Sequence, residues 1–225
     1  MLAERLEALR SSIADAASAA GRNVADIHLI AVTKFQPAAV VRELYELGVR
    51  DFGESRHQEA RAKAAELARL DLRWHFVGQL QTKKARQVRA YANVIHSVDR
   101  ASLVDALSDA AGSAADSRDC FVQLNLTDDP GRGGIAAEDL EPLVERVVAA
   151  PGLRLLGVMA VAPLGADPRR SFAAVRAASQ RVAAIDPDAV WISAGMSGDY
   201  REAILEGATH LRIGTAITGN RPAAG

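Results

Sequence analysis

A lysine follows an apolar segment near the start of the chain. The stretch LIAVTKFQP has the composition of a buried strand and carries Lys34 near its end. An unpaired ammonium group in a low-dielectric interior is costly, so a buried lysine usually has a partner or a lowered pKa. A lysine with a lowered pKa is a nucleophile that forms Schiff bases. The alternative is that Lys34 lies at the solvent-exposed end of the strand, without a chemical role.

Two segments near the other end of the chain have the composition of a phosphate site. In the first, SAGMSGDY, Gly195 lets a ligand approach the backbone closely. Ser197 is expected to cap the next helix while its own amide faces an anion. In the second, RIGTAI, Gly214 and Thr215 offer backbone amides and a hydroxyl. Each segment by itself is also ordinary turn chemistry.

Stretches suited to strands alternate along the chain with stretches of helical spacing. Residues 37–48 and 171–185 are examples of the helical stretches, and residues 1–21 predict an additional amphipathic helix at the N-terminus. A strand and a helix that repeat about eight times indicate a parallel sheet covered by helices. The predicted strands are residues 27–33, 49–53, 72–78, 93–98, 119–126, 153–160, 189–194 and 209–214.

The number of strands favours an α/β fold of the closed (β/α)8 TIM barrel type, with the N-terminal helix as an extra element. The length of 225 residues is close to that of a typical barrel, and residues 1–225 are expected to form a single domain. Residues 126–134 and 163–170 are predicted to be loops. An open doubly wound sheet is the alternative, because strand spacing does not show whether a sheet closes.

Barrel closure would bring Lys34 and the two glycine-containing segments together. The site of such a barrel lies at the carboxyl ends of its strands, and the loops after strands seven and eight often hold phosphate. Strand eight pairs with strand one, so Lys34 is expected beside these loops. An amine beside a phosphate suits a phosphorylated aldehyde or ketone. The candidates are bound pyridoxal 5′-phosphate (PLP) and a Schiff-base aldolase that acts on sugar phosphates.

Arg212 favours PLP over a sugar phosphate. Side chains alternate along a strand, so Arg212 and Gly214 are expected to face the barrel mouth while Leu211 and Ile213 face the opposite way. The nitrogen of a pyridine ring could then accept a hydrogen bond from Arg212. Because arginine keeps its proton, the ring nitrogen would stay unprotonated and the ring would be a weak electron sink. The alternative is that Arg212 forms a salt bridge near the barrel end.

Charge and cysteine content argue against several classes of partner and location. The net charge of −1 offers no electrostatic case for nucleic acid or an anionic membrane. No apolar run approaches the roughly 20 residues of a membrane-spanning helix, and the N-terminus lacks the apolar centre of a signal peptide. Cys120, the one cysteine, is expected in the core, and a single cysteine allows no disulfide within the chain, which fits a reducing compartment. Together with the missing membrane and signal segments, this favours the cytoplasm. Residues 83–89, KKARQVR, are predicted to form a solvated helix face.

A series of motifs resembles one known family over nearly the whole chain. On these motifs the chain is similar to the pyridoxal phosphate homeostasis proteins, PLP-binding barrels that are related to the N-terminal domain of alanine racemase. The motifs, in order, are AVTKFQP, DFGESRHQEA, WHFVGQLQTKKAR, IHSVD, VQLNLTDDPGRGGI, LGVMAVAP, SAGMSGDYREAI and HLRIGTAITGNR.

The resemblance implies a fold-type-III barrel that carries PLP as an internal aldimine on Lys34, with Arg212 at the pyridine nitrogen. No metal ligand is predicted. Along the ring the resemblance implies Val32 and Asn125, with Met159 and His75 nearby, and around the phosphate Ser193, Met196, Ser197, Gly214 and Thr215.

A few residues depart from the family pattern. Ser55 and Lys83 stand where the family often has asparagine, Thr218 where it often has phenylalanine, and Ala194 where it often has methionine. None of these departures removes the lysine, the phosphate loops or the arginine.

The residues favour a PLP-binding protein in intracellular PLP homeostasis without efficient turnover. Racemisation needs an acid–base group on each face of the substrate carbon. Lys34 can serve one face, but none of the tyrosines (Tyr45, Tyr91 and Tyr200) is a clear candidate for the other. The expected partners are PLP and apo PLP-dependent enzymes, and the chain is expected to be a monomer. The alternatives are a racemase-like PLP enzyme that acts on an amino acid and the Schiff-base aldolase.

Overall fold

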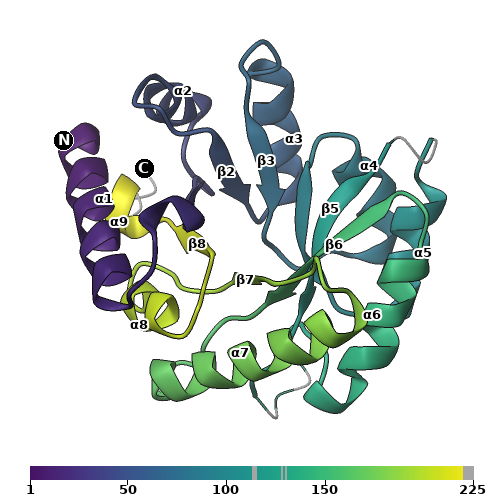
Figure 1. Cartoon of the computed structure of the whole chain (residues 1–225). Coiled ribbons are helices and arrows are strands. Elements are labelled where there is room, and N and C mark those ends of the chain that lie inside the picture. Colours follow the sequence, from purple (N-terminus) through teal and green to yellow (C-terminus); the bar gives the residue numbers. More distant parts are fainter. Residues whose placement is uncertain (113–115, 128, 130, 220–225) are drawn as a thin grey trace.

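Eight parallel strands close into a barrel in the computed structural model, which describes residues 1–112, 116–127, 129 and 131–219 (Figure 1). Each strand pairs with the next one along the chain, and the last pairs with the first from His28–His210 to Ala31–Ile213. The predicted (β/α)8 barrel is therefore confirmed, and the open sheet is wrong. The strands are β1 (His28–Val32), β2 (Asp51–Glu54), β3 (Arg73–Phe76), β4 (Val94–Val98), β5 (Arg118–Gln123), β6 (Leu153–Met159), β7 (Trp191–Ser193) and β8 (His210–Ile213).

Helices follow the strands and cover the outside of the barrel (Figure 1). The helices are α1 (Leu2–Ala19), α2 (Ala38–Glu46), α3 (His57–Glu66), α4 (Ala85–Arg89), α5 (Ala101–Asp109), α6 (Leu140–Ala149), α7 (Pro168–Ile185), α8 (Tyr200–Leu205) and α9 (Thr215–Thr218), with short 3-10 turns at Val24–Asp26, Thr82–Lys84 and Ala137–Asp139. In the described part of the chain, no helix combines the length and apolar composition that crossing a bilayer needs.

The predicted N-terminal helix, α1, packs on α8 and α9 at the other end of the chain (Figure 1). Its buried positions include Leu2, Leu6, Leu9 and Ile13, whose spacing of three and four residues places them on one helix face. The Arg5 Nε donates to the Ile217 carbonyl at 2.6 Å, which ties α1 to the end of α9. The first and last helices therefore cover the part of the barrel where β8 meets β1.

Side-chain alternation separates an outer apolar layer from the barrel interior. In β8, Leu211 and Ile213 belong to the large apolar cluster, which also includes the buried faces of the covering helices. The inward residues of β8 are His210 and Arg212, and His210 packs against the indole of Trp191 with ring centroids 4.7 Å apart. Four of the five histidines, His28, His75, His96 and His210, lie on strands and contact one another or other aromatic side chains inside the barrel.

Two local predictions are wrong. Residues 163–170 are not a loop throughout, because α7 begins at Pro168, where Asp167 caps the helix by accepting from the Arg169 amide at 3.0 Å. Residues 83–89 are not simply a solvated face. Arg89 is buried, and its guanidinium donates to the carbonyls of Asp116 and Gly152. Backbone oxygens accept from both terminal nitrogens of the guanidinium, while its Nε is buried without a hydrogen-bond partner among the described residues.

Cys120 is fully buried in β5, as predicted. Burial raises the pKa of its thiol to about 12, so the thiol stays protonated and unreactive.

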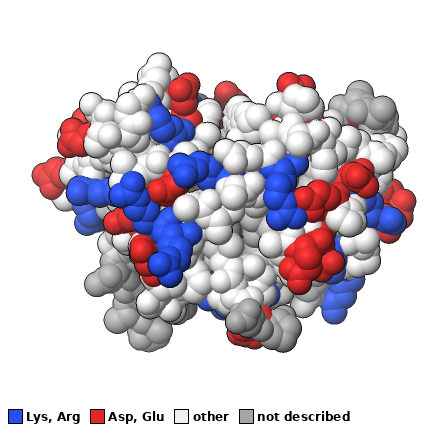
Figure 2. Space-filling model, turned by 60° about the horizontal axis from the view of Figure 1, so that its bottom comes forward, with Lys and Arg blue, Asp and Glu red and all other residues white. Residues whose placement is uncertain are grey.

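Charged side chains of both signs share the molecular face that includes α7 (Figure 2). The buried carboxylate of Glu206 accepts from Arg169 at 3.1 Å and pairs with Arg176 at 3.0 Å, and Arg181 pairs with Glu141 at 2.6 Å. Three arginines of α7, Arg169, Arg176 and Arg181, therefore have carboxylate partners.

Gly157 is required by the close packing of two strands. It lies in β6 beside a shift in the β5–β6 register and has a φ of +147°. A Cβ on Gly157 would lie 1.9 Å from the Trp191 carbonyl oxygen in β7.

We expect Gly157→Ala to lower the free energy of unfolding by more than about 2 kcal/mol, because backbone atoms cannot yield as a flexible side chain can. Urea denaturation measures this loss. Gly112→Ala is the matched control, since no atom lies within 4 Å of the added carbon, and it should change stability little. Equal effects of the two substitutions would contradict this account of the β6–β7 contact.

Candidate functional site

The loops after β7 and β8 are joined at the carboxyl end of the barrel. The Arg212 amide donates to the Gly195 carbonyl at 2.9 Å, and the Ala216 amide donates to the Ser197 Oγ at 3.2 Å. The prediction that Ser197 caps the helix that follows it is therefore wrong. That helix, α8, begins only at Tyr200, so the Ser197 hydroxyl is too far upstream and bonds to the start of α9 instead.

Backbone amides in these loops are available to an anion. Within the described residues, the amides of Ser197, Gly198, Gly214 and Thr215 donate no hydrogen bond. The neighbouring Met196 amide is occupied, since it donates to the Asp199 carboxylate at 2.6 Å. A cluster of unpaired amides is a suitable site for phosphate oxygens.

The shape of the first loop depends on Gly195. Its φ is +91°, and an added Cβ would lie 2.8 Å from the Ala203 Cβ and 3.0 Å from the Tyr200 Cα. Only glycine fits both the backbone conformation and the space.

Lys34 lies beside this region, in the turn that follows β1. Its side chain is exposed, as in the alternative that we left open from the sequence. The turn is closed by the Gln36 amide, which donates to the Thr33 carbonyl at 3.0 Å. The preceding strand ends at Val32, and a Cβ on Gly214 would lie 3.4 Å from the Val32 carbonyl oxygen. The barrel thus brings the lysine turn and the loop after β8 together.

A buried ion pair between Lys63 of α3 and Glu54 of β2 holds the backbone just before Lys34. The Lys63 ammonium of α3 donates to the Thr33 carbonyl and to the Glu54 Oε1, both at 2.7 Å. The Thr33 hydroxyl donates to the same carboxylate oxygen at 2.7 Å. One helical turn earlier, the Glu59 carboxylate accepts from the Phe35 amide at 3.0 Å. Helix α3 therefore holds the backbone on both sides of Lys34.

The Phe35 backbone has a φ of +66°, an uncommon value for a residue with a side chain. The hydrogen bond from its amide to Glu59 helps to hold this conformation.

The charge of the buried Glu54 carboxylate is stabilised by its hydrogen-bond partners. Burial raises the pKa of Glu54, while the hydrogen bond and charge of Lys63 act in the opposite direction. Its second oxygen, Oε2, is buried without a hydrogen-bond partner in the described residues. Removal of Lys63 would leave a buried carboxylate with only the Thr33 hydroxyl as a partner.

We expect Lys63→Met to lower the free energy of unfolding by about 3 kcal/mol or more, because breaking a buried pair strands the other charge. Urea denaturation of Lys63→Met and of the exposed control Lys83→Met tests this. Adding Glu54→Gln to Lys63→Met should restore part of the loss. A loss no larger than that of Lys83→Met would show that the pair does not stabilise the fold.

Arg212 is a buried cation whose direct partners are neutral. Its side chain donates to the Ser193 Oγ at 2.5 Å and to the Ala160 carbonyl at 2.8 Å, and the residue is 5% exposed. No carboxylate contacts it within the described part of the chain, so the salt bridge that we considered from the sequence is not present. Burial lowers the pKa of Arg212 to about 10, so the group is still charged at pH 7.

Met159 pairs with Ser193 between β6 and β7, whereas the side chains of His75 and Asn125 bond to residues outside these loops. His75 is deep in the barrel and bonds to Asp51 at 2.8 Å, and Met159 belongs to a small apolar cluster with Val94. The Asn125 side chain bonds within its own loop, to the carbonyls of Asp129 and Arg132 and to both donors of Thr127. The roles that the resemblance implies for these residues stay predictions.

Burial favours the neutral form of three histidines inside the barrel, His75, His96 and His210. Burial lowers the pKa of His210 to about 2 and also lowers the pKa values of His96 and His75, although the hydrogen bond to Asp51 opposes the shift at His75. A histidine whose folded pKa lies below its unfolded value of 6.5 binds protons more readily in the unfolded chain. Stability is therefore lost as the pH falls below 6.5.

We expect His210 to lower the free energy of unfolding by about 1 kcal/mol between pH 6.5 and 5.5, with a slope that approaches roughly 1.4 kcal/mol per pH unit at lower pH, while His75 and His96 act in the same direction. Urea denaturation at several pH values measures this slope. His210→Gln should flatten the slope by about one histidine's share, whereas His57→Gln, a change at a less buried histidine, should alter it much less. An unchanged slope in His210→Gln would mean that folding does not lower the pKa of His210.

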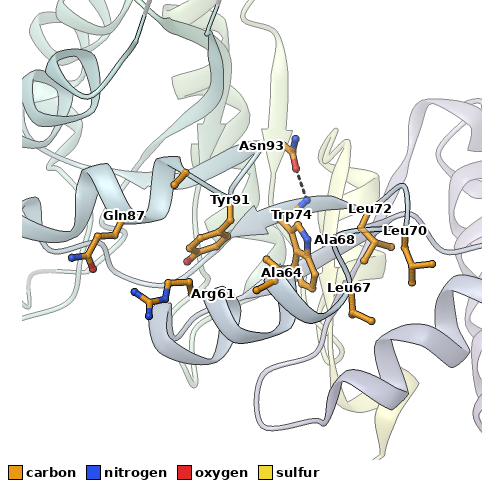
Figure 3. Close-up of a pocket in the computed structure, with 12 residues that line it drawn as sticks. Arg61, Ala64, Leu67, Ala68, Leu70, Leu72, Trp74, Gln87, Tyr91 and Asn93 are labelled. Atoms are coloured by element: carbon orange, nitrogen blue, oxygen red, sulfur yellow. Dashed lines mark hydrogen bonds between the residues drawn. The ribbon is translucent and has the colours of Figure 1, made fainter.

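A second hollow lies outside the barrel, beside α3 and the start of β3 (Figure 3). It encloses about 570 Å³ and is lined mainly by alanine and leucine side chains together with Trp74 and Tyr91. The dashed line in Figure 3 marks the hydrogen bond that the Trp74 amide donates to the Asn93 Oδ1, at 2.8 Å.

Known proteins similar to this chain have the same organisation. The family model for the N-terminal domain of alanine racemase matches residues 5–222. A pyridoxal phosphate homeostasis protein of Mycobacterium tuberculosis is 41% identical over 98% of this chain and 93% of its own length. The chain belongs to the pyridoxal phosphate homeostasis protein family. Other members, from Pseudomonas aeruginosa and Escherichia coli, are 40% and 34% identical, each over 98% of this chain and over 96% and 97% of their own lengths.

Solved structures support the assignment of the chain to this family. PipY from Synechococcus elongatus is 37% identical over 97% of this chain and all of its own chain, with a TM-score of 0.86 without PLP and 0.85 with PLP bound. Alanine racemase from Corynebacterium glutamicum, at 16% identity, shares the fold, with a TM-score of 0.69 over 98% of this chain and 62% of that enzyme. The resemblance drawn from the motifs is confirmed.

Sequence reasoning missed several residues that support the lysine turn or lie inside the barrel. Glu59 and Lys63 are four residues apart on α3, yet nothing in that spacing shows which loop they contact. His96 and His210 did carry a signal, because each lies in a predicted strand at a position that alternation with apolar neighbours turns inward.

Proposed function

We propose that the chain binds PLP at the carboxyl end of the barrel, holds it through an internal aldimine on Lys34, and serves PLP homeostasis without efficient turnover. The observation that carries the proposal is the buried guanidinium of Arg212, which has only neutral partners and lies next to the loops that follow β7 and β8. Membership of the family supports PLP as the ligand, as does the relative that was solved with PLP bound.

The residues at the mouth fit the parts of PLP. The unpaired amides of Ser197, Gly198, Gly214 and Thr215 suit its phosphate. Arg212 suits its ring nitrogen, which accepts a hydrogen bond from a donor that keeps its proton. The exposed amine of Lys34, on the neighbouring turn, suits its aldehyde.

The described tyrosines support the absence of efficient racemisation. The Tyr200 hydroxyl bonds to the Ser12 Oγ of α1 at 2.7 Å. The Tyr91 hydroxyl faces His57 at 3.4 Å, and the Arg50 guanidinium covers the Tyr45 ring at 4.0 Å from the centroid. Each of these tyrosines contacts residues outside the barrel mouth, so none lies where racemisation needs its second acid–base group.

We further propose that the chain acts as a monomer with one domain over residues 1–225, and that it works in the cytoplasm. Its partners would be apo PLP-dependent enzymes that receive the cofactor. A reversible covalent bond suits this role, because it limits the free aldehyde and still allows release.

Absorption spectroscopy with added PLP, followed by borohydride reduction and peptide mass mapping, tests the proposal. We expect a pyridoxyl group on Lys34 and none on the chain's other lysines, Lys63, Lys83 and Lys84. Lys34→Ala should abolish the fixed label, and the control Lys83→Ala should keep it. A label that persists at full level in Lys34→Ala would contradict the assignment of this lysine.

Incubation of the PLP-bound protein with common amino acids tests the absence of turnover. We expect no sustained change in the ratio of enantiomers and no consumption of substrate. Turnover at the rate typical of PLP enzymes, above about 1 per second, would instead favour the racemase-like alternative.

A further inference from the structure

A continuous line of hydrogen bonds crosses the barrel interior. The Arg212 guanidinium lies 2.5 Å from the Ser193 Oγ, which lies 2.8 Å from the His96 Nδ1. The His96 Nε2 lies 2.9 Å from the His75 Nδ1, and the His75 Nε2 lies 2.8 Å from the Asp51 Oδ1. These residues come from β8, β7, β4, β3 and β2, and we call them the interior network.

The position of each proton in the network follows from its two ends. The Asp51 carboxylate only accepts, so the His75 Nε2 must carry a hydrogen, and a neutral His75 then has a bare Nδ1. That nitrogen needs a donor, which is the His96 Nε2. The bare His96 Nδ1 accepts from the Ser193 hydroxyl, whose oxygen accepts from Arg212, a group that only donates. Every bond in the network therefore points from the arginine toward the aspartate.

The network is shielded from water except at its far end. His96 and Ser193 are fully buried, and the Phe121 ring stacks on His96 with centroids 4.7 Å apart. The Asp51 side chain is 26% exposed at the amino end of β2, at the opposite end of the barrel from the phosphate loops. Burial would raise the pKa of Asp51, but the hydrogen bond from His75 and the charge of nearby Arg73 outweigh burial and lower the pKa.

The orientation of the network stabilises both of its charges. The negative ends of the Ser193 hydroxyl and of the two imidazoles point toward Arg212, and their N–H or O–H groups point toward Asp51. Aligned hydrogen bonds polarise one another, and this effect is stronger in a low-dielectric interior. Arg212, which touches no carboxylate in the described residues, is thereby coupled to one across the barrel.

We propose that Ser193, His96, His75 and Asp51 are positioning residues for Arg212, which hold its guanidinium in one orientation and stabilise its charge where the ring of PLP is bound. The inference rests on the proposed function for the identity of the ligand alone. The network itself is a property of the protein without ligand.

Nitrogen-15 NMR of the protein without added PLP tests the network directly. We expect His75 and His96 to be neutral at pH 7, each with its hydrogen on Nε2. Asp51→Asn should shift the ring nitrogens of both His75 and His96, although Asp51 touches only His75. A hydrogen on the Nδ1 of either ring, or a doubly protonated ring, would overturn the assignment.

Absorption spectra and PLP dissociation rates test the role of the network. We expect Asp51→Asn, which is remote from the phosphate loops, to shift the spectrum of the PLP-bound protein and to accelerate release by about threefold or more. Ser193→Ala removes a partner of the Arg212 cation and should accelerate release by about tenfold or more. The control Asp188→Asn changes an exposed carboxylate and should do neither.

Combining the two substitutions separates coupling through the network from general damage. Once Ser193→Ala has broken the line, adding Asp51→Asn should have little further effect on spectrum or release, whereas independent structural damage would add. If PLP binds and Asp51→Asn leaves both readouts unchanged, the positioning role is wrong. If the wild-type protein does not bind PLP, the proposed function fails, and the NMR measurement still decides whether the network exists.

Discussion

Burial of a guanidinium without a contacting carboxylate is the constraint on which the barrel interior depends. Arg212 is enclosed by β6, β7 and β8, and its contacts are a hydroxyl and a carbonyl. A buried cation is costly unless dipoles or an anion compensate for it. The interior supplies dipoles, through Ser193 and His96, and leaves the mouth of the barrel suited to a ligand that carries an acceptor and a phosphate. The need to compensate the buried charge of Arg212 explains why the centre of the barrel contains polar side chains such as Ser193 and His96.

Helix α3, rather than the barrel interior, holds the backbone on both sides of Lys34. Helix α3 supplies Lys63 and Glu59, which bind backbone groups on either side of Lys34, while the Lys34 amine stays exposed. A backbone held on both sides of an accessible amine suits reversible capture of an aldehyde. In this turn, residues 33–36, Lys34 supplies the one acid–base side chain.

Local sequence patterns predicted much of this arrangement. The eight strands were placed to within a few residues, because strand alternation and the glycines and prolines between segments are local signals. The inward direction of Arg212 followed from period-two alternation. The predicted capping role of Ser197 was wrong, since the start of α8 depends on how the loop packs against α9 rather than on the residue type. The burial of Arg89 was missed for a similar reason, because its carbonyl partners are distant in sequence.

The sequence by itself determined the number and order of the strands, the place of Lys34 after the first one, and the motifs of the family. Only the tertiary structure decided which side chains meet. Lys63 reaches the Thr33 carbonyl, and His75 and His96 join Ser193 to Asp51, through contacts between residues 21 to 97 positions apart. Such contacts depend on strand register and barrel closure, which short-range propensities do not encode.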